Sequence, residues 1–429
     1  MKSYRLCDLS EKQISNLCQR NPGSDPYIMQ TCEDIFQNVE SRGDEAIREY
    51  TKRFDEVDIS QSKVSDEEFS AAESKVSMRF RTALEHAARN IRKFHMAQQV
   101  DEKPVEVESG IRCWRENRAI DSVGLYIPGG NAVLPSTVLM LGIPAQIAGC
   151  KRIALCVPPQ KDCTVTAEVL VAARIVGIRE VFKIGGAQAI AALATGTETI
   201  AGVDKILGPG NRWVQAAKLL ATLRGVAIEM VAGPSEVLVV ADESAKSEWV
   251  ACDLVSQAEH GVDSRVILAT TSRQLLEEVG QLVWRFIEDL PLRDLAEQSL
   301  KESFNLLVSS LDEALIFANQ YAPEHLILQV NNSEQWVSRV QNAGSVFLGS
   351  WSPEVAGDYA SGTNHTLPTS GLAKAYSGVS VDTFVKRITF QKITPKGLKG
   401  LAPTLEALAE MEGLEGHRRA VKIREESQF

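Results

Sequence analysis

Gln257 and His260 are residue types that can bind an ion or a polar ligand, and their spacing places them together. Both lie in the motif SQAEHG near the end of a predicted helix, three residues apart, so they share one helical face. From there, an amide and an imidazole can contact a common ion or ligand just beyond a sheet edge. The alternative is a solvated final turn in which His260 only interacts with the helix dipole.

A carboxylate and an imidazole adjoin at Glu324 and His325, in the motif YAPEHL. Pro323 ends the preceding helix, and a predicted strand follows directly. Neighbouring acid and base groups suit two proton transfers. The alternative is a polar loop that enters a strand, with Glu324 solvated.

Two further segments combine acids with histidine. Residues 352–365 form a long loop of small residues that contains Asp358 and His365, and loops of this composition often carry function. The motif EGLEGH places Glu412 and His417 in the C-terminal tail. The role of His365 stays open between a functional and a loop-structuring one.

Glycine turns follow three predicted strands, at 128–130, 185–188 and 208–211. Such turns expose backbone N–H groups at helix starts to phosphate oxygens, and Gln188 and Asn211 add amide side chains. Neither Gly-x-Gly-x-x-Gly nor a Walker A loop is present, so any nucleotide binds by other means. As generic glycine loops, these turns are weak evidence for a nucleotide.

The helix that carries Gln257 has one apolar face, because Val250, Leu254 and Ala258 recur at every fourth position. We expect this helix to end at His260. Gly261 would then take the left-handed conformation that closes many helices.

Short apolar runs alternate with helical stretches from residue 119 to residue 350, which predicts mainly parallel α/β sheets. The predicted strands of the first half are 122–127, 152–158, 180–184, 205–207 and 226–231. Those of the second half are 236–241, 265–269, 305–309, 326–330 and 343–348. Ligands of such sheets bind at the carboxyl ends of the strands. The two similar halves are consistent with an ancient duplication, although no residue-level repeat establishes one.

The expected organisation has five parts. Residues 1–25 form an N-terminal arm with a Pro/Gly break at 21–23, and 26–118 form a helical segment that packs with the second α/β domain. Residues 119–235 form the first α/β domain and 236–380 the second. The tail, 381–429, is too short and too charged to form a hydrophobic core of its own, so it should lie across another domain or subunit.

Composition narrows the class of protein. The net charge of -10, without any basic block, disfavours nucleic acid and anionic membranes as partners. The eight cysteines form no Cys-x-x-Cys pair, which fits free thiols in a reducing cytoplasm. Neither a signal peptide nor a membrane span is expected.

Taken jointly, separated motifs make the chain resemble the histidinol dehydrogenase family from about residue 25 to 425. The motifs are GLYIPGG, KIGGAQAIAALA, LGPGN, AGPSEVLVVAD, SQAEHG, YAPEHL, AGDYASGTNHTLPT and EGLEGH. The resemblance implies a zinc-dependent enzyme that oxidises L-histidinol to L-histidine through the aldehyde, with two NAD-linked hydride transfers. It also implies two incomplete Rossmann-like domains, the first on the NAD side and the second with zinc and the catalytic residues.

The resemblance also assigns residues. The implied zinc ligands are Gln257, His260, Asp358 and His417. Glu324 and His325 match the proton-transfer pair, with His325 as base for the alcohol and Glu324 as activator of water for the aldehyde. The implied dinucleotide contacts are Tyr126, Gln188 and Asn211. The implied substrate contacts are Ser235, Gln257, His260, His325, Asp358, Glu412 and His417.

In the resembling enzymes the tail crosses to the other subunit of a homodimer, so that Glu412 and His417 would act in trans. Three alternatives differ in chemistry. A sister dehydrogenase for another small alcohol, such as a sulfonated diol, would favour added arginine. A zinc hydrolase using Glu324 would bind no NAD, and a noncatalytic metal-binding protein would show no turnover.

Overall fold

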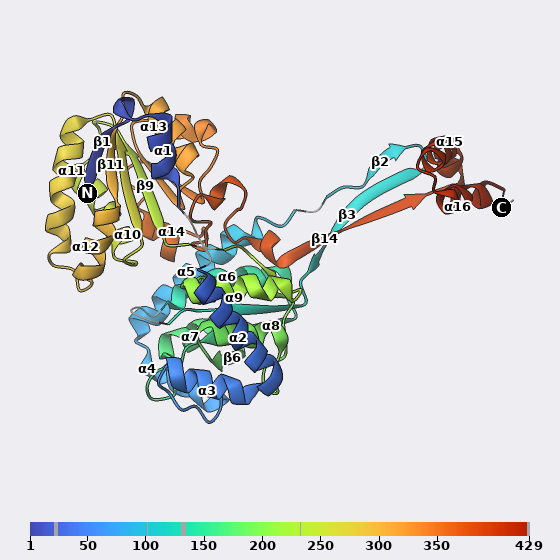
Figure 1. Cartoon of the computed structure of the whole chain (residues 1–429), viewed down its shortest axis with the longest axis horizontal. Helices are drawn as coiled ribbons and strands as arrows, with labels where there is room; N and C mark the ends of the chain where they lie inside the picture. The colour runs from blue at the N-terminus through green and yellow to red at the C-terminus, as the bar shows by residue number, and fades with distance from the viewer. Residues whose placement is uncertain (21–24, 101, 130–133, 232, 427–429) are drawn as a thin grey trace.

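Two parallel α/β domains and a long projecting ribbon make up the chain (Figure 1). The computed structural model describes residues 1–20, 25–100, 102–129, 134–231 and 233–426. The predicted break at 21–23 and Gly130 of the first glycine turn lie outside the described residues. The predicted mixed α/β class with mostly parallel sheets is confirmed.

The first sheet has five parallel strands in the order β6-β5-β4-β7-β8. Its strands are β4 (Ser122–Tyr126), β5 (Arg152–Val157), β6 (Glu180–Lys183), β7 (Lys205–Leu207) and β8 (Ala227–Ile228). The helices between them are α6 (Pro135–Ala148), α7 (Ala167–Ile175), α8 (Gly186–Thr195) and α9 (Arg212–Leu223). Every predicted strand is present, although the last is only two residues long.

The second sheet has six parallel strands in the order β1-β11-β10-β9-β12-β13. Its strands are β1 (Lys2–Arg5), β9 (Glu236–Ala241), β10 (Arg265–Thr270), β11 (Phe304–Leu307), β12 (His325–Gln329) and β13 (Ser345–Leu348). The helices are α10 (Ser247–Ala258), α11 (Arg273–Ile287), α12 (Arg293–Glu302), α13 (Leu311–Tyr321) and α14 (Glu354–Tyr359). Without β1, both sheets follow the order 3-2-1-4-5, which is an incomplete Rossmann arrangement.

The N-terminal segments divide between the two domains. β1 extends the second sheet, and α1 (Glu11–Cys18) contacts α13. The next helices are α2 (Pro26–Arg42), α3 (Asp44–Phe54), α4 (Asp66–Lys75) and α5 (Met78–Met96). They pack against α6, α7, α8 and α9 of the first domain. The prediction that segment 26–118 packs with the second domain is therefore wrong. The apolar faces of these helices instead complete the cores on the two sides of the first sheet.

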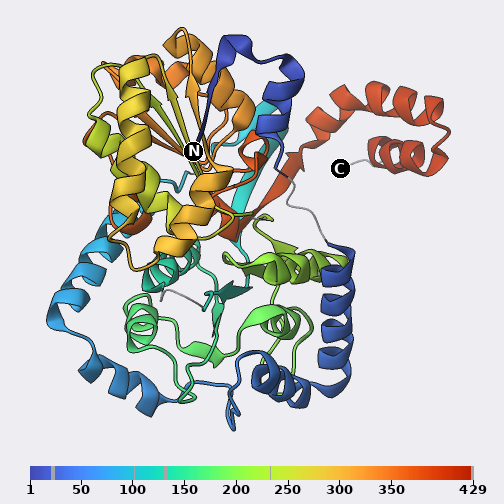
Figure 2. The same ribbon diagram turned by 60° about the vertical axis from the view of Figure 1, so that its left-hand side comes forward.

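An antiparallel three-stranded ribbon extends away from both domains, in the order β14-β3-β2 (Figures 1 and 2). Its strands are β2 (Val105–Glu108), β3 (Ile111–Ala119) and β14 (Val385–Ile393), and α15 (Pro395–Met411) and α16 (Glu415–Glu426) follow at its end. The sequence analysis did not predict these strands, because they are mostly exposed and charged, and β3 and β14 are paired over a long sequence separation. Short 3-10 helices lie at Leu6–Asp8, Ser333–Arg339, Leu372–Lys374 and Val381–Phe384. No helix in the described part of the chain is both long and apolar enough to cross a bilayer.

Candidate active site

A buried polar centre lies where strands β9 and β12 begin. His325 is the first residue of β12, and it pairs with Val237 of β9 and Ser345 of β13. Glu236, the first residue of β9, donates its backbone N–H to Oε2 of Glu324 at 2.9 Å. The centre therefore lies at the amino ends of the second sheet's strands, opposite to the ends where parallel sheets usually bind ligands.

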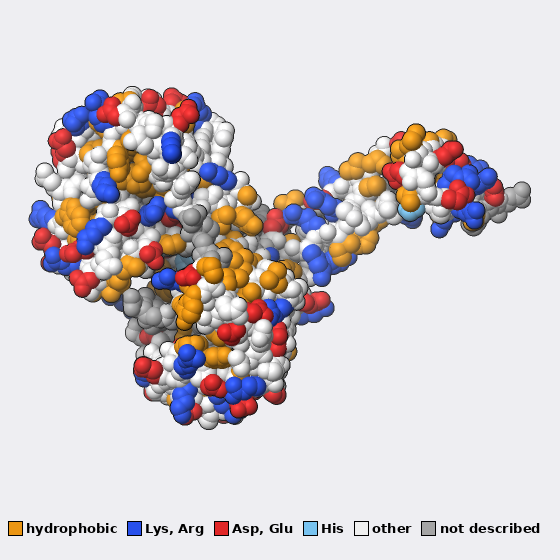
Figure 3. Space-filling view, viewed as in Figure 1, with side chains coloured by type: hydrophobic (Ala, Val, Ile, Leu, Met, Phe, Trp, Pro, Cys, Tyr) orange, Lys and Arg blue, Asp and Glu red, His pale blue; other side chains and the backbone are white. Residues whose placement is uncertain are grey.

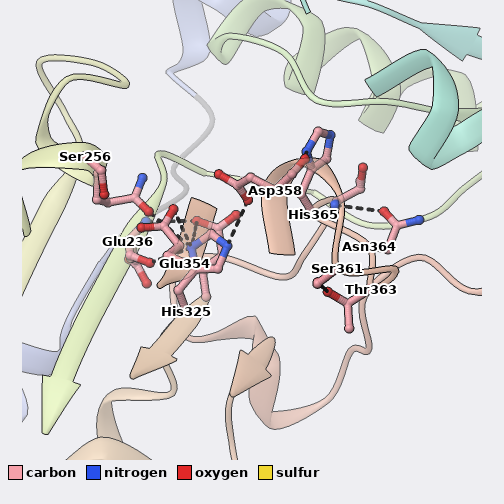
Figure 4. Close-up of polar contacts among 12 residues, drawn as sticks. Glu236, Ser256, His325, Glu354, Asp358, Ser361, Thr363, Asn364 and His365 are labelled. Atoms are coloured by element: carbon pink, nitrogen blue, oxygen red, sulfur yellow. Dashed lines mark hydrogen bonds and ion pairs between the residues drawn. The ribbon is translucent and has the colours of Figure 1, made fainter. Parts of the chain in front are cut away.

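Three carboxyl groups surround the imidazole of His325 (Figure 4). Nδ1 lies 3.7 Å from an oxygen of Glu324 and 3.7 Å from an oxygen of Glu354, while Nε2 lies 3.6 Å from Oδ1 of Asp358. Nδ1 also lies 3.1 Å from Oε1 of Gln257 and 3.3 Å from the carbonyl oxygen of Glu236. These oxygens hold the ring proton on Nδ1, so a neutral ring presents Nε2 as the free acceptor.

Burial and mutual charge shift the pKa values of this centre. Burial raises the pKa of Glu324 to about 8 and the pKa of Glu354 to about 8. Burial acts to lower the pKa of His325, but Glu324, Asp358 and Glu354 outweigh it and raise the value to about 10. A cation bound to these carboxylates would remove that stabilisation of the charged ring and lower the pKa of His325.

Gln257 and His260 reach this centre from the end of α10. Val250, Leu254 and Ala258 are fully buried, which confirms the predicted apolar face. The predicted helix end at His260 is wrong, because α10 ends at Ala258 with Glu259 as the C-cap. The prediction that Gly261 has a left-handed backbone is also wrong, because its φ is not positive. The final turn closes instead with a hydrogen bond from the N–H of His260 to the carbonyl oxygen of Gln257.

The geometry of the centre fits a metal ion. Donor atoms of His260, Glu354 and Asp358 all lie within 4.8 Å of one another. Within the described residues, Nε2 of His325 and both carboxylate oxygens of Glu354 are buried without a hydrogen-bond partner. Unsatisfied buried donors and acceptors are costly unless a ligand engages them. One imidazole and two carboxylates suit zinc or a similar divalent ion.

Glu354 is the member of this centre that the sequence analysis did not single out. It lies four residues before Asp358 on α14, so the two carboxylates share one helical face. That spacing was the available signal, and it was hidden because the segment was interpreted as a loop. The structure instead has a short helix there, with Glu354 and Asp358 both buried.

His365 fixes the backbone beside Asp358. Its Nδ1 lies 2.9 Å from the carbonyl oxygen of Asp358, and its Nε2 lies 3.1 Å from the hydroxyl of Thr137 on α6. The ring thus links the second domain to α6 of the first. Of the two roles considered for His365, functional or loop-structuring, these contacts favour the loop-structuring one.

A cavity of about 1040 Å³ opens beside this centre, and both domains contribute to it. Ser235, directly before β9, and His260 of the second domain line it, together with Asn211 and Trp213 of the first. The cavity has room for a small substrate next to the centre, and polar side chains among its lining residues can bind one.

A second cavity of about 880 Å³ lies at the carboxyl ends of strands in the first domain. Tyr126, Gln188 and Asn211 all line it. The Tyr126 hydroxyl accepts the N–H of Gly186 at 3.0 Å, and Oδ1 of Asn211 caps α9. Both amide atoms of Gln188 are buried without a hydrogen-bond partner in the described part of the chain, so they are available to a ligand. Asn211 and Trp213 line both cavities, so the two cavities are neighbours.

Gly208 shapes the loop that carries Asn211, and we predict that Gly208→Ala destabilises the protein. Its φ is +135°, and an added Cβ would meet the carbonyl oxygen of Tyr126 at 2.1 Å. The loss should be at least about 2 kcal/mol in the free energy of urea unfolding. Gly280→Ala in α11 is the control, because its nearest atom lies 3.9 Å away. An unfolding free energy equal to that of the control would contradict the prediction.

The two tail residues of the predicted site lie apart from this centre within one chain. Glu412 is the C-cap of α15 and His417 lies on α16, and both are exposed. Figures 1 and 2 place these helices at the far end of the ribbon. The remaining predicted residues of the zinc and catalytic sets, Gln257, His260, Glu324, His325 and Asp358, are close together in the second domain.

Comparisons with known proteins agree with this geometry. A family model described as histidinol dehydrogenase matches residues 18–425. The chain is 51% identical over 415 residues to the histidinol dehydrogenase of Bacteroides thetaiotaomicron, which covers 97% of each chain. It is 48% identical over 427 residues to the chloroplastic histidinol dehydrogenase of Arabidopsis thaliana, which covers 99% of this chain and 91% of that one.

The crystal structure of histidinol dehydrogenase from Elizabethkingia anophelis has the same fold. It superposes with a TM-score of 0.96 at 47% identity, and the match covers 99% of this chain and 98% of that one. The chain therefore belongs to the histidinol dehydrogenase family of oxidoreductases, which act in histidine biosynthesis.

Proposed function

We propose that the chain oxidises L-histidinol to L-histidine through L-histidinaldehyde, in two successive hydride transfers to NAD. The observation that carries the proposal is that Asn211 and Trp213 line both the polar centre's cavity and the cavity lined by Tyr126 and Gln188, so the two cavities are neighbours. A substrate in the first cavity can thus meet a dinucleotide in the second. The scattered free cysteines favour the cytoplasm as the place of this activity.

The proposed zinc ligands are Gln257, His260 and Asp358 of one chain and His417 of a second chain. Once bound, the ion supplies a Lewis-acidic anchor for the imidazole and amino nitrogens of histidinol. Glu354 adjoins the same position, and when it is ionised its carboxylate would, with that of Asp358, balance the charge of the bound ion.

The proposed dinucleotide contacts are Tyr126, Gln188 and Asn211. The free amide of Gln188 can hydrogen-bond the cofactor, and the turn at Gly186 begins α8, whose N-terminus favours negative charge. Bound NAD supplies the hydride acceptor.

His325 is the proposed base of the first oxidation. Its Nδ1–H is held by Gln257 and by the backbone of Glu236, which leaves Nε2 to accept the alcohol proton as hydride leaves the carbon. Glu324 is the proposed base of the second oxidation. Its carboxylate takes a proton from the water that adds to the aldehyde, and the hydrate then loses a second hydride.

The substrate is held by residues of two chains in this proposal. Ser235, Gln257, His260, His325 and Asp358 come from one chain. Glu412, an acceptor for the N–H groups of the substrate's amine, and His417 come from the tail of a second copy in a homodimer. Large hydrophobic residues of the ribbon and tail are exposed in the single chain, as expected for a surface that another subunit covers (Figure 3).

The proposed substrate contacts separate this function from its alternatives. An amino-imidazole substrate needs Glu412 and His417, whereas a sulfonated diol has no imidazole or amine for them to bind. A hydrolase or a noncatalytic metal-binding protein would not need the second cavity.

The function is tested by the NADH formed per L-histidinol consumed, before and after chelation. We expect two NADH per substrate, loss of turnover on chelation and recovery with zinc. One NADH would indicate a simple alcohol dehydrogenase. No NADH would indicate a different substrate or a different class of protein.

A further inference from the structure

Arg20, from the N-terminal arm, has a buried guanidinium beside the catalytic pair. Nε and Nη2 donate to the two carboxylate oxygens of Glu236 at 2.7 and 3.1 Å, and the side chains are only 5% and 3% exposed. A bidentate pair of this kind is geometrically specific. It fixes the carboxylate of Glu236 at the first residue of β9.

The same guanidinium holds the turn that precedes the catalytic pair. Nη2 donates to the carbonyl oxygens of Tyr321 and Ala322 at 2.7 and 3.3 Å, and the guanidinium carbon lies 3.5 Å from the centre of the Tyr321 ring. Ala322 has a left-handed backbone with φ 54°, which is unfavourable for a residue with a Cβ. The positive charge at the carboxyl end of α13 therefore stabilises a strained turn two residues before Glu324.

Glu236 connects Arg20 to both catalytic side chains. Its side chain binds Arg20, its backbone N–H donates to the Glu324 carboxylate, and its backbone carbonyl lies 3.3 Å from Nδ1 of His325. Arg20 thus acts on Glu324 and His325 by two routes, one through the turn and one through β9. It touches neither the reacting atoms nor the proposed zinc ligands directly.

We propose that Arg20 is a positioning residue for Glu324 and His325, with Glu236 as its intermediary. The expected loss of kcat with histidinol rests on the proposed function, whereas the expected change in the order of the Glu324 and Glu236 segments does not. Arg20→Met leaves the buried carboxylate of Glu236 without its partner, which destabilises the fold as well as the alignment. The variants are therefore compared at a temperature at which each is folded. A misplacement of about 1 Å at a reacting group can cost about 10²-fold in rate.

The test compares Arg20→Met and Arg20→Lys with Arg224→Met in the full-length protein. Arg224 is the matched control, because it also pairs with carboxylates, those of Glu33 and Glu40, and lies over an aromatic ring, that of Phe36. For Arg20→Met we expect kcat with histidinol to fall about 10- to 100-fold, with KM within about threefold. Arg20→Lys should recover part of the loss, since it keeps the charge but not the fork.

Hydrogen exchange measured by mass spectrometry gives a readout that does not need turnover. Peptides covering 234–238 and 320–326 should exchange faster in Arg20→Met than in the wild type, and should be unchanged in Arg224→Met. If the wild type does not oxidise histidinol, the proposed function fails while exchange still decides the role of Arg20.

Three results would overturn the inference. They are a folded Arg20→Met variant with kcat within twofold of the wild type, an equal loss of kcat in Arg224→Met, and unchanged exchange in both peptides. If Arg20→Met does not fold, Arg20→Lys decides by the same criteria.

Discussion

His325→Asn is expected to lower kcat for histidinol oxidation by roughly 10²- to 10⁴-fold, the usual contribution of a general base. The asparagine amide can replace the Nδ1–H contact to Gln257, but it has no group in the place of Nε2. The protein should therefore fold and bind zinc, while the alcohol proton has no acceptor. Stopped-flow measurement of the first NADH formed from histidinol would detect this loss.

Glu324→Gln is the companion variant, and it should affect the other half-reaction. Its amide oxygen can still accept the N–H of Glu236, but the side chain can no longer take a proton from water. Oxidation of histidinaldehyde should fall by a similar factor of roughly 10²- to 10⁴-fold, with the first hydride transfer much less affected.

His86→Asn is the control for this pair of variants. His86 is exposed on α5, which packs against the first domain. Its kcat should stay within about threefold of the wild type. Equal losses of aldehyde oxidation in His325→Asn and Glu324→Gln would contradict the division of roles between the two residues.

Removal of the tail after residue 393 is expected to abolish activity and much of the dimer contact. The deletion removes α15 and α16, and with them Glu412 and His417. Met411 is 87% exposed and Leu408 is 57% exposed in the single chain, so these helices present apolar surface that a second subunit would bury. Light scattering and the histidinol assay check both consequences. An active, monodisperse monomer would contradict the shared site.

Mixed dimers test the shared site without a deletion. Glu324→Gln and His417→Asn should each have little activity alone. If His417 acts in trans, a mixed dimer contains one site with both wild-type residues, and random mixing should restore about a quarter of the wild-type activity. If His417 acts within its own chain, co-expression restores nothing.

Local patterns explain why much of the fold was predictable. Strands buried on both faces are short apolar runs, and all ten predicted strands of the two domains were found within a few residues of their predicted ends. The apolar face of α10 was equally clear. In contrast, β3 and β14 lack such a pattern, because both are largely exposed and each depends on a partner distant in sequence.

The sequence by itself determined the class of fold, the family and the residue types available for chemistry, because these depend on local periodicity and on motifs. Only the tertiary structure decided which of these residues meet. It placed the polar centre at the amino ends of β9 and β12, added Glu354 through the helical turn of α14, and brought Arg20 to Glu236 across 216 positions. The physical reason is that strand order and side-chain convergence are set by long-range packing, which one stretch of sequence does not encode.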